Sequence, residues 1–189
     1  MPKHVDRIGT ILGLDPGTNN LGLGWVQADL GDLRIQSTHS QLLVAEKMRP
    51  NPYIAQAMGD RHARLHVLQQ NLLEMLFYLR PVCVVSESPF FNPRRPNAYE
   101  ALVQTVDMIK HALYRYDDQM TLTFIDPPSV KKAVGASGNA KKEEVQSRIV
   151  KVEELNYSGS VPLSQLDEHS IDAIAVAYAK LTQFRRNRS

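Results

Sequence analysis

Three acidic side chains stand in segments that otherwise look apolar and buried. Asp15 ends the run "ILGL", Glu87 ends "VCVVS", and Asp172 interrupts "IDAIAVAYA". A buried carboxylate without a partner costs several kcal/mol of folding free energy or gives up its charge. One divalent cation can neutralise several carboxylates at once, so the three positions predict a metal site.

A histidine near the third carboxylate extends this predicted donor set. His169 lies three residues before Asp172, so one turn of helix presents both side chains on the same face. Oxygen donors with one imidazole suit Mg²⁺ or Mn²⁺ better than a structural zinc ion. Glu168 lies on nearly the same face and remains an alternative, whereas Asp167 is predicted to be the helix N-cap.

Each residue also has a structural interpretation. Asp15 stands in "DPGT", where Asp-Pro-Gly favours a turn. Glu87 could accept backbone hydrogen bonds in the loop that follows it, and His169 could simply flank the last helix. Asp172 is the hardest to explain in this way, because apolar residues surround it.

The elements that would position these side chains follow from the spacing of apolar residues. Strands are predicted at 9–14, 21–29, 33–44, 82–86 and 121–126, and helices at 52–80, 97–116, 127–134, 140–155 and 167–184. This order predicts an α/β domain with a mixed sheet flanked by helices on both faces. If the strands that end in Asp15 and Glu87 are parallel neighbours, both carboxylates lie at the same edge of the sheet.

Composition limits the class of protein. The 189 residues, 43% hydrophobic and 22% charged, predict one domain over residues 1–189, with a disordered basic tail from about residue 184. The single cysteine, Cys83, lies in an apolar run and excludes a disulfide within the chain. No signal peptide or membrane span is recognisable, so a cytoplasmic protein is expected, either in a bacterium or in the host of a virus.

Basic residues gather beside predicted loops. A net charge of +2 is only weakly basic, so their distribution is more informative than their number. Any one cluster could be a solvated surface, but several beside loops favour nucleic-acid binding. The clusters are Arg94-Arg95, Lys131-Lys132, Lys141-Lys142 and the tail "RRNRS".

Four segments, in order and at fitting separations, resemble the RuvC family of Holliday-junction resolvases. They are "ILGLDPGTNNLGLGWV", "VVSESPFF", "VKKAVGASGNAKKEEV" and "HSIDAIAVAYA". The resemblance implies an RNase H-like fold with a five-stranded mixed sheet. It also implies a homodimer that makes paired cuts in branched DNA during recombination and repair.

The same resemblance implies roles for individual residues. Two Mg²⁺ ions, replaceable by Mn²⁺, would be held by Asp15, Glu87, His169 and Asp172, with His169 either a ligand or a general base. Phe90 would insert near the junction crossover, and Phe91 is the competing candidate. Phosphate contacts are expected from Lys131 and Lys142, helped by Lys132, Lys141, Arg94 and Arg95. Val103-Gln104 departs from the Gly-Gln typical of the family.

Three other functions compete with a junction resolvase: an ATPase, a nuclease for RNA and a binding protein without catalysis. A sugar-kinase or actin-like ATPase also has an Asp-x-Gly-Thr loop after a strand, but it needs a second such loop, which the sequence lacks. An RNase H-like nuclease acting on single-stranded RNA would share the metal chemistry. A junction-binding protein without catalysis is disfavoured because all four site positions are filled. The lysine-bearing segment 130–145 favours the resolvase.

Overall fold

The computed structural model describes residues 7–89 and 96–188, and these residues contain one mixed five-stranded sheet. The strands lie in the order β3-β2-β1-β4-β5. Their bounds are β1 Ile8–Asp15, β2 Asn20–Asp29, β3 Ile35–Val44, β4 Cys83–Glu87 and β5 Leu122–Ile125. The first three strands pair antiparallel, whereas β1, β4 and β5 pair parallel. The predicted mixed sheet is therefore confirmed.

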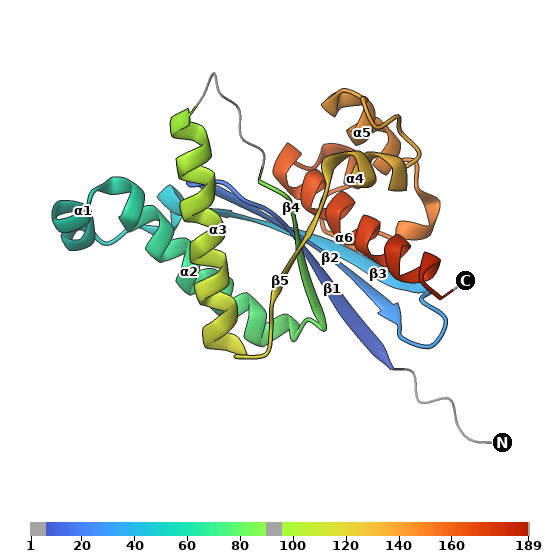
Figure 1. Ribbon diagram of the computed structural model, residues 1–189, viewed down its shortest axis with the longest axis horizontal. Coiled ribbons are helices and arrows are strands. Elements are labelled where there is room, and N and C mark those ends of the chain that lie inside the picture. The colour runs from blue at the N-terminus through green and yellow to red at the C-terminus, as the bar shows by residue number, and fades with distance from the viewer. Residues whose placement is uncertain (1–6, 90–95, 189) are drawn as a thin grey trace.

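Helices cover both faces of the sheet. The α-helices of the described residues are α1 Pro52–Met58, α2 Asp60–Leu79, α3 Pro96–Tyr116, α4 Pro127–Ala133, α5 Lys142–Ile149 and α6 Glu168–Arg186. Figure 1 shows α2 and α3 on one face and α6, with α4 and α5, on the other, while α1 extends away from the sheet.

Side chains of β1 divide between two hydrophobic cores. Leu12 and Leu14 pack with α2 and α3, whereas Ile11 packs with the α6 side. Because successive side chains of a strand point to opposite faces, a strand covered on both sides needs apolar residues throughout. This explains why the segment before Asp15 is almost entirely apolar.

Glycines in β1 and β2 let α6 lie directly on the sheet. A methyl group on Gly13 would overlap the carbonyl oxygen of Ala173, and one on Gly24 would overlap the backbone nitrogen of Ile174. Glycine in a strand interior often marks such a close backbone approach. The glycines therefore allow a short distance between the α6 backbone and the strands.

Two predicted helices differ from the structure. The helix expected between Pro52 and Pro81 is divided at Gly59, whose φ of 89° lies outside the helical region. The helix expected over 140–155 ends at Ile149, because the chain turns to bond with β3. There, Thr38 N–H donates to the Asn156 carbonyl, and Ser158 N–H donates to the Thr38 carbonyl.

The basic tail was expected to be disordered, but it is ordered as far as residue 188. Helix α6 continues to Arg186. The Arg185 guanidinium donates to the Leu33 carbonyl and to the Glu154 carboxylate, and Arg188 donates to the Leu30 carbonyl. These bonds tie the end of the chain to the β2–β3 hairpin. Among the described residues, no helix has the length and apolar character needed to cross a membrane.

We expect Gly24→Ala to destabilise the protein by about 1–3 kcal/mol, because α6 must move to make room for the methyl group. Urea unfolding of the variant and the wild type measures this difference. Gly138→Ala is the matched control, because its methyl group would meet its nearest neighbours at an ordinary 3.6 Å. An equal loss of stability in both variants would contradict the close-approach explanation.

Candidate active site

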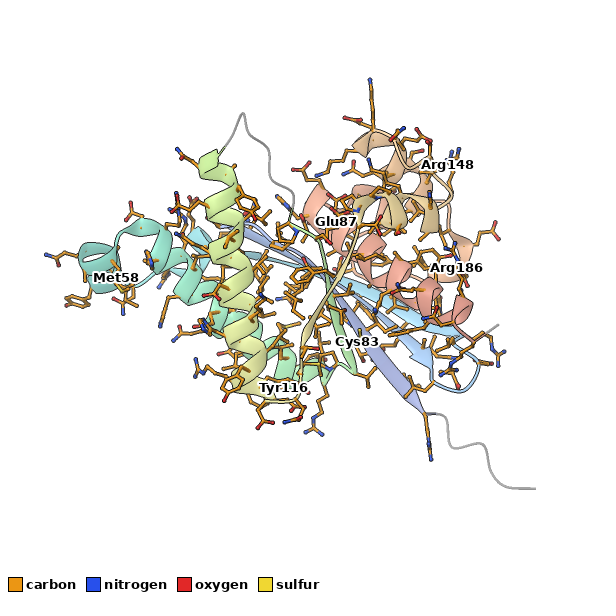
Figure 2. All side chains as sticks on the ribbon, viewed as in Figure 1. Met58, Cys83, Glu87, Tyr116, Arg148 and Arg186 are labelled. Carbon is orange, nitrogen blue, oxygen red and sulfur yellow. The ribbon has the colours of Figure 1, made fainter. Side chains whose placement is uncertain are left out.

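Two carboxylates lie side by side at the carboxyl edge of the sheet. Strands β1 and β4 are parallel, and their register pairs Leu14 with Ser86, so Asp15 and Glu87 follow on adjacent strands. Figure 2 shows Glu87 at this end of β4 and Cys83 at the opposite end. The expectation that parallel pairing would bring these carboxylates to one edge is confirmed.

The start of α6 brings the other two predicted residues over this edge. Asp167 is the N-cap, as predicted, and its side chain accepts hydrogen bonds from the Ser170 backbone N–H at 2.9 Å and from the Ser170 hydroxyl at 2.6 Å. His169 and Asp172 therefore lie in the first turns of the helix. His169 Nδ1 lies 2.6 Å from Asp15 Oδ2, a hydrogen bond that joins α6 to β1.

The backbone near this hydrogen bond requires a glycine. Gly22 pairs with Asp15 across the β1–β2 ladder. A methyl group at Gly22 would overlap the His169 carbonyl oxygen. Gly22 thus allows the first turn of α6 to approach β1 closely enough for His169 to reach Asp15.

A cavity of about 350 Å³ opens beside these residues. Three carboxylates and two lysines line it, together with apolar residues of α4, α5 and α6. The lining residues are Asp15, Glu87, Pro127, Val130, Lys131, Lys142, Val145, Asp172 and Ala175. The cavity has the mixed lining expected of a binding site for a charged ligand.

Crowding of negative charge changes the acidity of the cavity. Desolvation, followed by repulsion from Asp172 and Asp15, raises the pKa of Glu87 to about 7, although part of its side chain faces solvent. Burial also raises the pKa of Asp172, opposed mainly by its hydrogen bond with Lys142. Burial is thus the main reason that these two carboxylates hold their protons more tightly, and the negative charge of their neighbours adds to it.

The two lysines of the cavity make different contacts. Lys142 Nζ lies 2.8 Å from Asp172 Oδ2 and 3.3 Å from Glu168 Oε2. Lys131 Nζ donates instead to the Ala140 carbonyl at 2.8 Å. The structure thus brings both predicted phosphate-contacting lysines to the cavity, while Lys132 and Lys141 do not line it.

The remaining predicted residues lie away from the cavity lining or outside the described part of the chain. Phe90, Phe91, Arg94 and Arg95 lie outside the described residues. Glu168, which the sequence left as an alternative member of the site, contacts Lys142 and lies 3.8 Å from His169 Nε2. The sequence patterns used above do not identify the glycines below α6. Their signal is glycine at alternate positions of one strand, Gly22 and Gly24, which often marks close packing.

The donor chemistry of the cavity fits a divalent cation. Asp15, Glu87 and Asp172 line the cavity, and His169, which is not a lining residue, contacts Asp15. Carboxylate oxygens with one imidazole are a suitable set for Mg²⁺ or Mn²⁺. Within residues 7–89 and 96–188, no three His, Cys, Asp or Glu side chains converge closely enough to hold a metal ion as they stand. Asp172 instead contacts Lys142, and Asp15 contacts His169. Metal binding would therefore require these side chains to rearrange.

Comparison with known proteins identifies a family. The profile described as "Crossover junction endodeoxyribonuclease RuvC" matches residues 11–180. The RuvC of Thermus thermophilus is 28% identical over 170 residues, which cover 88% of this chain and 90% of that protein. The RuvC of Moorella thermoacetica is 31% identical over 139 residues, covering 74% of each chain.

Solved structures show the same fold. The T. thermophilus RuvC in complex with Holliday junction substrate superimposes with a TM-score of 0.69 at 22% identity, covering 94% of this chain and 96% of that one. The yeast mitochondrial Holliday junction resolvase gives 0.61 at 12% identity, covering 94% and 82%. These likenesses confirm the predicted RNase H-like fold.

The shifted pKa of Glu87 predicts how stability depends on pH in metal-free buffer. A pKa of about 7 in the folded protein, against an ordinary 4.5, means that the folded state holds this proton more tightly than the unfolded chain does. The contribution of Glu87 to wild-type stability should therefore fall as pH rises from about 4.5 through 7. Glu87→Gln should be the more stable protein above this range, and the difference should disappear below it.

Urea unfolding in EDTA, at pH values that bracket this range, measures the effect. Glu74→Gln is the matched control, because Glu74 is exposed on α2. If Glu87→Gln and wild type keep a constant difference across the range, the pKa of Glu87 is not raised as described above.

Proposed function

Because this chain belongs to the RuvC family of crossover junction endodeoxyribonucleases, which are metal-dependent nucleases, we propose that it cuts Holliday junctions at the carboxylate cavity. The observation that supports this most directly is the meeting of Asp15, Glu87 and Asp172 at one edge of the sheet. The activity serves DNA recombination and repair, and a cytoplasmic location would suit it.

The proposed metal ligands are Asp15, Glu87, His169 and Asp172, and the proposed ions are two Mg²⁺ with Mn²⁺ as a substitute. Bound divalent cations would make an attacking water more acidic and offset the charge that develops on the scissile phosphate and the leaving oxygen. Asp15, which ends the central strand β1, would be one of the residues that hold the ions. His169 is also proposed to orient the Asp15 carboxylate, because the two side chains are hydrogen-bonded.

DNA would approach the cavity along its lysine-bearing side. Lys131 and Lys142 line the cavity and are proposed to contact phosphates, with Lys132 and Lys141 as helpers. Such contacts make DNA binding strongly salt-dependent. From the family resemblance, we assign Phe90 or Phe91 to stacking at the crossover, and Arg94 and Arg95 to the adjacent backbone.

A homodimer is part of the proposal. A four-way junction has two-fold symmetry, and a two-fold dimer places one active site on each of two equivalent strands. A single-stranded RNA substrate is not favoured, because the related proteins are crossover junction endodeoxyribonucleases.

Asp15→Asn tests the assignment of the active site. We expect junction cleavage in Mg²⁺ to fall about a hundredfold or more, since the loss of this proposed metal-binding carboxylate would remove several kcal/mol of transition-state stabilisation. Junction binding should persist. The measurement uses a labelled four-way junction beside linear duplex and single-stranded RNA, with Mg²⁺ or EDTA.

Asp118→Asn is the matched control, because this exposed aspartate lies in the turn between α3 and β5, at the opposite end of the sheet. Paired, metal-dependent cuts by wild type and by Asp118→Asn, but not by Asp15→Asn, support the proposal. Cleavage of RNA with the junction left whole would refute it, and loss of both binding and folding in Asp15→Asn would make Asp15 a structural residue.

Phe90→Ala tests the stacking assignment. We expect it to slow cleavage of an intact junction by roughly tenfold, in keeping with the 1–3 kcal/mol of a base–aromatic stack, and to affect a pre-nicked junction much less. Phe91→Ala, measured in parallel, distinguishes the two candidates. Equal effects on intact and pre-nicked junctions would remove the proposed role of Phe90.

A further inference from the structure

Lys142 occupies a position that helix electrostatics disfavour. It is the first residue of α5, and the preceding residue, Lys141, provides no side-chain cap. The N-terminus of a helix carries partial positive charge, so a lysine there is repelled by it. A residue in such a position needs a compensating contact elsewhere.

The compensating contact is with the acidic side chains of α6. Lys142 Nζ lies 2.8 Å from Asp172 and 3.3 Å from Glu168, so one ammonium group joins two carboxylates. Lys142 thus places one ammonium group between two carboxylates at the edge of the cavity.

The same side chain is partly exposed to solvent. About 45% of the Lys142 side chain is exposed, against 25% for that of Asp172. Rotation of the lysine would break two ion pairs but would leave the hydrophobic core intact. Lys131, by contrast, is held by a backbone carbonyl rather than by a carboxylate.

From these contacts, and resting on the function proposed above, we propose that Lys142 is an exchangeable internal cation. It neutralises Asp172 and Glu168 in the metal-free protein, and a divalent cation that binds Asp172 displaces it. The released ammonium group then lies at the rim of the cavity, where it can contact a DNA phosphate. One side chain would thereby couple metal binding to DNA binding.

The proposed exchange has a thermodynamic signature. Because the Lys142 ammonium group competes with metal for Asp172, it weakens metal binding in the absence of DNA. Removing the ammonium group should therefore strengthen metal binding. The coupling is reciprocal, so metal should strengthen DNA binding more in wild type than in a variant without the lysine.

The first experiment measures the accessibility of Lys142 in the full-length wild-type protein by amine acylation and mass spectrometry. The labelling rate of Lys142 should rise about threefold or more on adding Mg²⁺. That of Lys151, an exposed residue beyond the far end of α5, should stay the same. In Asp172→Asn the Lys142 rate should be high with or without Mg²⁺.

The second experiment measures Mn²⁺ affinity without DNA, by electron paramagnetic resonance. Lys142→Met should bind Mn²⁺ about threefold more tightly than wild type, because a like charge is removed. Lys151→Met, the matched control for loss of one positive charge, should not change the affinity. Lys142→Arg keeps the competing charge and should stay close to wild type.

The outcomes separate the two proposals. If wild type binds Mn²⁺ but the Lys142 labelling rate is unchanged by metal, or if Lys142→Met binds Mn²⁺ no more tightly than Lys151→Met, the exchange is overturned and the proposed active site stands. If wild type binds no Mn²⁺, both proposals fail. Higher Lys142 labelling together with tighter binding in Lys142→Met supports the exchange.

Discussion

The close contact between the α6 backbone and the glycines of β1 and β2 is the constraint on which the site depends. Gly13, Gly22 and Gly24 leave no side chain between strand and helix. The first turns of α6 can therefore lie directly above the end of β1, where His169 meets Asp15 and Asp172 faces the same cavity. A wider separation would leave the same residues present but too far apart to act together.

Burying several carboxylates close together at this edge is electrostatically unfavourable, and two features of the protein reduce the unfavourable energy. Part of the cost appears as protonation, since the pKa of Glu87 is raised to about 7. Another part is offset by internal cations, chiefly the ammonium group of Lys142 beside Asp172. A divalent cation bound in the cavity would reduce the repulsion among these carboxylates further.

The helical layer on the α6 side links this chemistry to DNA. Helices α4 and α5 bring Lys131 and Lys142 to the cavity from outside the sheet, and Figure 1 shows both helices beside the first half of α6. The residues proposed to contact DNA phosphates and those proposed to hold metal therefore line the same cavity. Lys142 could therefore exchange its contact with Asp172 for a contact with a DNA phosphate by rotating its side chain, without a movement of the backbone.

Sequence alone determined the elements and the candidate residues, because apolar periodicity reports burial and a carboxylate in an apolar segment needs a partner. Asp15, Glu87 and Asp172 were identified in this way, and so was Asp167 as an N-cap. Periodicity did not predict the break at Gly59 or the end of α5 at Ile149, because both depend on backbone conformation and on bonds to distant strands. The parallel pairing of β1 with β4, the packing of α6 on glycines and the contact of Lys142 with Asp172 are visible only in the folded chain. These facts depend on which segments meet in space, and local sequence patterns do not encode such long-range pairing.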